Sequence, residues 1–186
     1  MQRCDWAQTN DQLMLNYHDY EWGTPEHNSI KLFELLSLEI FQAGLSWKIV
    51  LNKRSGFGRA FKQFNISKVA LMNENDVDLL LNDKDIIRNK RKILATINNA
   101  QIIENKLPKG DFSNYIWSFT GKHSINHNYS AASQMPKYDD LALLVSKNMK
   151  KVGFKFTGPV TIYSFLEACG IIDDHQINCF KYKKSV

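Results

Sequence analysis

Hydrophobic residues recur along this chain at the three- and four-residue spacing of amphipathic helices. The longest segments with this spacing are bounded by capping or turn residues and cover 30–43, 86–105, 138–151 and 161–169. Shorter helices are expected over 10–19, 47–53 and 77–81, and a turn over 55–58. Strand signals are scarce, because no segment alternates cleanly between apolar and polar residues. The pattern therefore predicts an all-α fold.

One acidic residue interrupts the hydrophobic side of the segment 30–43. At 100° per residue, Glu39 falls inside the apolar arc of that helix, beside Leu35 and Leu36. An isolated carboxylate among apolar side chains is unfavourable unless a partner or a ligand stabilises it. Aromatic rings that could surround this acid belong to Trp6, Tyr17, Trp22 and Trp47.

Such a set of side chains indicates a pocket for a flat nitrogenous ligand. Tryptophan and tyrosine faces bind electron-poor or cationic rings, and Glu39 could accept hydrogen bonds from the ring edge. The alternative has two parts. The aromatic residues could belong to the core, and Glu39 could pair with a nearby arginine or a backbone N–H.

Positive charge is modest in total but clustered along the chain. The 186 residues include 24 lysines and arginines against 19 acids, a net charge of +5. The clusters are Lys84, Arg88, Lys90, Arg91 and Lys92, then Lys147, Lys150, Lys151 and Lys155, and finally Lys181, Lys183 and Lys184. Such patches suit a phosphate backbone, with solvated helix faces as the alternative.

Length and cysteine content bound the class of protein. The length suits one large domain or two small lobes, separated weakly by a loop over 120–137. Three cysteines, an odd number, argue against a disulfide framework. No apolar stretch approaches the ~18 residues of a membrane span, and polar residues follow Met1 closely, unlike a signal peptide. We expect a cytoplasmic protein that does not enter a membrane.

Two pairs of metal-ligating residues lie near the ends of the chain. His175 and Cys179 are four residues apart, so on a helix they would point the same way. With Cys4 and His18 they would form a closed Cys2His2 set, which suits a structural zinc ion. The alternative is two unrelated buried thiols and two ordinary histidines. The remaining histidines, His27, His123 and His127, lie in polar stretches and are expected at the surface.

A helix–hairpin–helix motif is possible over residues 141–170. One lysine-bearing helix would end near Gly153, and a short turn through Lys155 and Gly158 would lead into the next helix. Such a hairpin can offer backbone N–H groups to one phosphate. The alternative is a simple corner between two helices.

Several long segments match one known family in the same order. They are RCDW, YHDYEWG, LFELLSLEIFQAGLSW, GFKFTG, YSFLEACG and DDHQINC, and they resemble 3-methyladenine-DNA glycosylase I from Arg3 to about Cys179. The resemblance implies a helix–hairpin–helix DNA glycosylase fold in a single domain, 1–186, with two helical lobes also possible. It implies a monofunctional N-glycosyl hydrolase of base excision repair. That enzyme flips N3-methyladenine out of alkylated double-stranded DNA and releases free 3-methyladenine, leaving an abasic site.

The resemblance also implies roles for individual residues. A structural zinc would tie the two ends of the chain together through Cys4, His18, His175 and Cys179. Glu39 and Tyr17 would hydrogen-bond the extruded base, Trp47 would stack on it, and Trp6 and Trp22 would line the pocket. The DNA contacts would be Gln42, Gly44, Leu45, Lys155 and Gly158, with Leu45 as the wedge that enters the base stack.

Two positions bear on the chemistry that the wider superfamily uses. Where that superfamily carries a catalytic lysine, this chain has Val160, so strand cleavage through a Schiff base is not expected. Asp173 lies near the position of a superfamily aspartate, and its role is left open. Glu39 would select and hold the base, because a base methylated at N3 is already cationic and leaves without protonation.

Two other classes of protein would explain part of the pattern. A non-catalytic DNA-binding module would account for the basic clusters, the hairpin and the zinc, but not for Glu39 among aromatic residues. A protein that binds a free nucleobase would account for the pocket but not for the hairpin. A monomer is the simplest expectation for the assembly.

Overall fold

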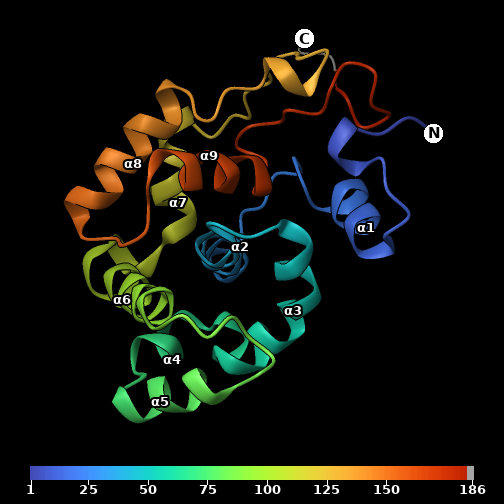
Figure 1. Ribbon diagram of the computed structural model, residues 1–186. Helices are drawn as coiled ribbons and strands as arrows, with labels where there is room; N and C mark the ends of the chain where they lie inside the picture. The colour runs from blue at the N-terminus through green and yellow to red at the C-terminus, as the bar shows by residue number, and fades with distance from the viewer. Residues whose placement is uncertain (184–186) are drawn as a thin grey trace.

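The computed structural model describes residues 1–183, and the regular elements in that range are all helical, as predicted (Figure 1). Beyond the helices, the described chain has one isolated parallel β-bridge, between Ile125 and Ile172. The α-helices are α1 Gln12–Tyr20, α2 Ser29–Gln42, α3 Trp47–Ala60, α4 Ile66–Ala70, α5 Glu74–Asn82, α6 Lys90–Lys106, α7 Phe112–Trp117, α8 Asp140–Val152 and α9 Pro159–Ala168. Short 3-10 helices cover Asp5–Ala7, Lys62–Phe64, Pro108–Gly110, Ser118–Thr120 and Ala132–Gln134.

Helix α2 lies at the centre of the fold. In Figure 1 it is seen almost end-on, with α3, α6 and α9 around it, and it contacts α3, α6, α7 and α9. Every residue from 32 to 41 is buried, so the helix is enclosed on all sides rather than along the single apolar arc predicted from its pattern. Glu39 lies near the end of this enclosed helix, so the side chains around it determine whether its carboxylate is stabilised.

Capping residues set several helix ends where the sequence predicted them. The Asn28 side chain accepts hydrogen bonds from the first turn of α2, and Asn73 and Asp76 form a capping box at α5. Gly153 ends α8 in the left-handed region, with φ 117°.

The predicted turn over 55–58 is wrong, because α3 continues through it to Ala60. A Cβ at Gly56 would collide with the backbone carbonyl of Asp85. This glycine therefore permits a close approach between two segments and does not break the helix. The predictions also missed α4 and α7, which are too short to show a helical period.

Helices α8 and α9 form the predicted hairpin. Ser146 on α8 donates a hydrogen bond to the carbonyl oxygen of Thr157 in the connecting turn, at 2.6 Å. Asn99 on α6 bonds both backbone groups of Lys155, at 2.8 and 3.1 Å. These contacts fix the turn that precedes the first residue of α9 at Pro159.

The segment that follows α9, drawn in red, passes beside the N-terminal segment, drawn in blue (Figure 1). The backbone N–H of Phe180 donates to the carbonyl oxygen of Gln2 at 3.0 Å. None of the helices in residues 1–183 combines the length and hydropathy that a bilayer-spanning segment needs. Of the basic residues named above, Lys184 lies outside the described residues.

Candidate functional site: an acidic aromatic pocket beside a cysteine–histidine cluster

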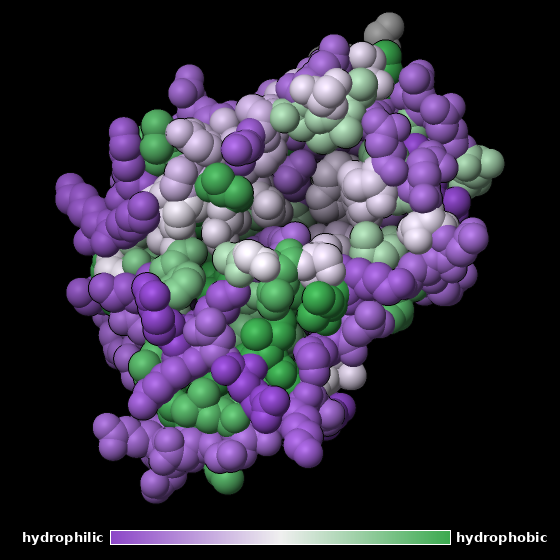
Figure 2. Space-filling view, in the orientation of Figure 1, coloured by the Kyte–Doolittle hydropathy of each residue, from purple (hydrophilic) through white to green (hydrophobic). Residues whose placement is uncertain are grey.

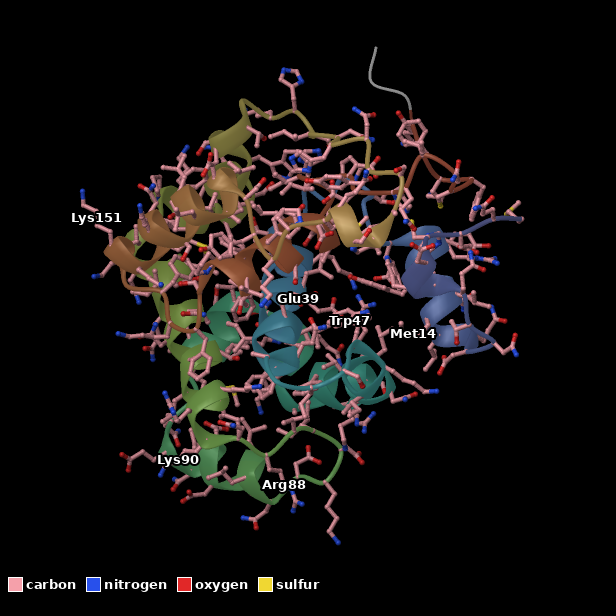
Figure 3. The ribbon with its side chains drawn as sticks, turned by 45° about the horizontal axis from the view of Figure 1, so that its top comes forward. Met14, Glu39, Trp47, Arg88, Lys90 and Lys151 are labelled. Atoms are coloured by element: carbon pink, nitrogen blue, oxygen red, sulfur yellow. The ribbon has the colours of Figure 1, made fainter. Side chains whose placement is uncertain are left out.

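A cavity of about 260 Å³ lies where α1, α2, α3 and α9 converge. Figure 2 shows this face of the molecule hollowed near its centre. In Figure 3, Glu39 and Trp47 lie next to each other near the centre, and Met14 faces them from α1. The cavity is lined by Trp6, Met14, Tyr17, Trp22, Glu39, Gln42, Trp47, Met135, Ser164 and Glu167. It therefore brings together all five residues that the sequence placed in a pocket.

The aromatic rings of the pocket pack against one another at their edges. The Trp6 and Trp22 rings are 5.2 Å apart at an interplanar angle of 79°. The Tyr17 and Trp47 rings are 4.9 Å apart at 49°. Edge and tilted contacts hold the rings firmly and leave ring faces available for a flat ligand.

Glu39 is buried in this pocket with no compensating charge. Only 5% of it is exposed, and within residues 1–183 no hydrogen bond or ion pair reaches its carboxylate. Burial raises the pKa of Glu39 to about 8. The cavity lining contains no lysine, arginine or histidine. The alternative of a buried acid satisfied by a nearby arginine is therefore wrong for Glu39.

Glu34, one and a half turns earlier on α2, shows what a satisfied buried acid looks like. Its carboxylate accepts hydrogen bonds from Arg54 at 2.8 Å and from Lys31 at 2.9 Å. Burial is the largest single effect on Glu34 and would raise its pKa, but the charges and hydrogen bonds of Arg54 and Lys31 together outweigh burial, so the pKa is lowered. The same helix thus carries one paired acid and one unpaired acid, and the unpaired one faces the cavity.

A second acid in the pocket, Glu167, was missed by the sequence reasoning. Glu167 comes from α9 together with Ser164, which lies three residues earlier on the same helix face. Burial raises the pKa of Glu167 well above its ordinary value, with a further contribution from the negative charges of Asp174 and Glu39. No signal in the pattern of α9 marked this residue, because it becomes notable only when α9 packs against α2.

Three of the four predicted metal ligands form one buried cluster. The ligand atoms of Cys4, His18 and Cys179 all lie within 4.8 Å of one another. Cys179 Sγ is 3.4 Å from His18 Nε2. A tetrahedral zinc ion with ordinary bond lengths separates a sulfur and a nitrogen ligand by about 3.6 Å, so the spacing suits that metal. This buried cluster could hold a metal ion.

His175 lies beside the cluster, although the helix assumed for it is wrong. Helix α9 ends at Ala168, and residues 173–179 form an irregular segment followed by a turn. The His175 ring lies 5.1 Å from the His18 ring, and its Nε2 atom is buried without a hydrogen-bond partner in the described chain. A buried ring nitrogen without a partner fits a fourth metal ligand.

Both histidines are oriented by a carboxylate in the way that metal ligands commonly are. Asp19 lies 2.8 Å from His18 Nδ1, and Asp173 lies 2.6 Å from His175 Nδ1. Asp173 also accepts a bond from the His175 backbone N–H at 3.2 Å.

The sulfur atoms already accept backbone hydrogen bonds, as metal-bound thiolates do. Gln176 N–H points to Cys4 Sγ and Lys181 N–H points to Cys179 Sγ, each at 3.4 Å. Burial raises the pKa of the Cys4 thiol to about 12, so a thiolate at this place requires a cation.

The cysteine–histidine cluster forms the back of the aromatic pocket. The Trp22 ring meets His175 edge-on at 4.7 Å, and the Trp6 ring meets His18 at 5.2 Å. Gly23 follows at φ +69°, and a Cβ there would lie 2.7 Å from the His175 ring. A metal ion that held these two histidines in place would therefore also hold the Trp6 and Trp22 rings that line the pocket.

The turn after α2 lies at the edge of the pocket. Leu45 is 41% exposed, and Gly44 adopts φ +83°, a conformation that favours glycine. Gln42 lines the cavity itself. The turn therefore presents an exposed apolar side chain at the edge of the pocket.

The basic residues are placed in two different ways. Figure 3 shows Arg88, Lys90 and Lys151 toward the edges of the molecule, away from Glu39. Lys155 is exposed on the hairpin turn. Lys92 is the exception and corrects its assignment to a surface cluster: it is only 6% exposed, because its ammonium group bonds backbone carbonyls of α2 and the following turn.

Two of the three other histidines are exposed, as expected, but His127 is not. It is half-buried, and its Nδ1 atom lies 2.8 Å from the buried carboxylate of Asp174. This contact ties the loop over 120–137 to the segment after α9.

Comparisons with known proteins agree with this geometry. The model of the methyladenine glycosylase family matches residues 6–182. DNA-3-methyladenine glycosylase 1 of Escherichia coli (strain K12) is 43% identical over 183 residues, which are 98% of this chain and 97% of that protein. A crystal structure of 3-methyladenine DNA glycosylase I has a TM-score of 0.94 at 41% identity, covering 98% of this chain and 100% of that chain. A variant of such an enzyme in complex with 3-methyladenine has a TM-score of 0.93 at 39% identity, with full coverage of both chains.

Proposed function

The chain belongs to the methyladenine glycosylase family and removes 3-methyladenine from DNA, and we propose that the aromatic pocket around Glu39 holds the extruded base. The observation that carries this proposal is the unpaired, buried carboxylate of Glu39 among four aromatic rings. A base inside the duplex cannot present its glycosidic bond to such a pocket, so the nucleotide must first be flipped out.

Each pocket residue has a task that follows from its chemistry. Glu39 accepts a hydrogen bond from the exocyclic amine of the base and favours an electron-poor ring. The Tyr17 hydroxyl bonds the ring edge, and Trp47 stacks on the ring, which contributes about 1–3 kcal/mol. Trp6 and Trp22 complete the walls.

The reaction needs little acid catalysis, because methylation at N3 makes adenine cationic while it is attached to DNA. The bond between the base and the sugar carbon breaks, and its electron pair leaves with the base, which becomes neutral. Water forms the new bond to the sugar carbon and releases a proton to solvent. Glu39 is therefore the catalytic residue through charge stabilisation and recognition.

We propose zinc as the metal of the cluster, bound by Cys4, His18, His175 and Cys179. When bound, a closed Cys2His2 zinc ion supplies structure rather than chemistry, because no coordination position is left for water. Two observations support the zinc proposal: the Nε2 atom of His175 has no hydrogen-bond partner in the described chain, and a carboxylate lies next to the Nδ1 atom of each histidine. Asp173 is engaged by His175 and is proposed to orient that ligand rather than to activate water.

We propose that double-stranded DNA binds across the hairpin and the turn after α2. Leu45 enters the base stack beside Gln42 and Gly44, and Lys155 with the backbone around Gly158 holds a phosphate. One chain carries both surfaces, so a monomer suffices, and the family match over residues 6–182 favours a single domain. We propose that the protein acts on DNA in the cytoplasm, in keeping with its bacterial relatives.

The deciding experiment measures release of free 3-methyladenine from methylated duplex DNA under single-turnover conditions. We expect release by the wild type and a loss of about 100-fold in Glu39→Gln, since one charge-stabilising group is removed. Glu74→Gln, an exposed acid at the beginning of α5, is the matched control. Binding of methylated DNA without base release would favour a non-catalytic module, and binding of the free base alone would favour a nucleobase-binding protein.

A further inference from the structure

The pocket contains a second acid that the roles above leave unused. Glu167 reaches the cavity from α9, whereas Glu39 reaches it from α2. Across the described residues, the Glu167 carboxylate takes part in no ion pair and no hydrogen bond. Two unpaired acids therefore share one cavity whose lining includes no basic residue.

Three features make a charge on Glu167 unfavourable. The side chain is partly buried, which removes part of its hydration, and the negative charges of Asp174, Glu39 and Asp139 act on it. It also lies next to the last residue of α9, Ala168, where the negative end of the helix dipole repels an acid. An uncharged side chain of the same size would avoid all three effects, so the fold itself gains nothing from a carboxylate here.

We propose that Glu167 is a specificity-determining residue, which selects a cationic base over a neutral one. The inference rests on the proposed function of the pocket. A base methylated at N3 carries a positive charge in DNA, whereas ordinary bases carry none. Both acids are protonated in the empty pocket near neutral pH, but a bound cation favours the charged form of a nearby carboxyl group and lowers its pKa. A cationic base therefore draws both side chains toward the carboxylate form and is held by their charge, whereas a neutral ring is not.

The two acids divide the work of recognition. Glu39 bonds the amine edge, which is present on the cationic substrate and on the neutral product alike. Glu167 responds mainly to charge, so its contribution is large for the attached base and small for the released one. Removing Glu167 should consequently affect excision and product binding differently.

The test compares two measurements on Glu167→Gln. Single-turnover excision of 3-methyladenine from duplex DNA should fall about tenfold, which corresponds to about 1.4 kcal/mol. The dissociation constant for free 3-methyladenine, from quenching of tryptophan fluorescence, should change less than about twofold, since so small a factor is well under 1.4 kcal/mol. Glu39→Gln should weaken both, and Glu167→Asp, which keeps the charge, should recover most of the excision rate.

The outcomes separate this inference from the function on which it rests. Wild-type excision by Glu167→Gln, or equal losses in both measurements, would overturn the role of Glu167 and leave the pocket assignment intact. No release of base by the wild type would instead remove the proposed function. Glu167→Met, which is neutral and apolar, repeats the comparison if the glutamine variant does not fold.

Discussion

The ammonium group of Lys92 donates a hydrogen bond of 2.6 Å to the carbonyl oxygen of Ala43, the residue that follows α2. A second bond, of 2.9 Å, reaches the carbonyl oxygen of Phe41. Helix α2 ends at Gln42 and a left-handed Gly44 follows Ala43, and the carbonyl oxygens of Phe41 and Ala43 at this end are bound by Lys92. The lysine thereby fixes the end of the helix that carries both Glu39 and the turn with Leu45.

Replacing this lysine should separate DNA engagement from base binding. We expect Lys92→Met to lower the free energy of unfolding by about 2 kcal/mol, because hydrogen bonds from a charged donor are lost. Affinity for a duplex with an abasic-site analogue should fall about tenfold, since the wedge turn is no longer held in place. Affinity for free 3-methyladenine should change little.

The matched control is Lys106→Met, at the exposed end of the same helix. It should leave both affinities unchanged. Unaltered binding of the abasic duplex by Lys92→Met would contradict the positioning role, whatever the change in stability.

The unpaired state of Glu39 predicts how stability depends on pH. Its pKa rises from 4.5 to about 8 on folding, so between these values the folded chain keeps a proton that the unfolded chain releases. Raising the pH across this window therefore lowers the free energy of unfolding, by about 1.4 kcal/mol per pH unit at most. A glutamine at position 39 cannot lose a proton, so the stability of Glu39→Gln should not fall across this pH window.

Thermal unfolding measured from pH 5 to pH 9 checks this sign. Glu39→Gln should melt close to the wild type at pH 5 and above it at pH 9, although it excises poorly. Glu74→Gln should follow the wild type throughout. A Glu39→Gln variant that is less stable than the wild type at pH 9 would show that the carboxylate has a partner in the fold.

The residues that line the aromatic pocket could be predicted from the sequence because their signal is local. Glu39 stands out within one helix, and the aromatic residues lie in segments that resemble a known family. Glu167 gave no such signal, since an acid near the end of an amphipathic helix is ordinary until that helix packs against α2. Lys92 likewise seemed one of five clustered cations, and only its contacts with the end of α2 distinguish it.

The limits of periodicity explain the errors in secondary structure. Gly56 and Gly58 suggested a turn, yet α3 passes through both because Gly56 allows the segment at Asp85 to approach closely. His175 and Cys179 were assigned to one helix on their spacing, yet an irregular segment holds them. Their ligand geometry depends on contacts with Cys4 and His18, which no local pattern encodes.

The cysteine–histidine cluster should couple metal content to stability. Cys179→Ala removes one ligand, so zinc content and melting temperature should fall together, because binding free energy contributes to folding. Cys169→Ala is the matched control, since Cys169 is also buried but lies outside the cluster and donates to the carbonyl oxygen of Leu166. Atomic absorption and thermal unfolding of both variants provide the comparison. A wild type without zinc would exclude the metal assignment.

The hairpin lysine should contribute to DNA affinity through charge alone. The Lys155 side chain is exposed, while Asn99 holds its backbone, so Lys155→Ala should leave the turn folded. Affinity should weaken to a similar extent for every DNA sequence, and the slope of log affinity against log salt should fall by about one. Titration of an unmodified duplex at several salt concentrations measures that slope. Lys106→Ala serves as the control lysine away from the hairpin. If the slope of Lys155→Ala equals that of the wild type, Lys155 does not contact a phosphate.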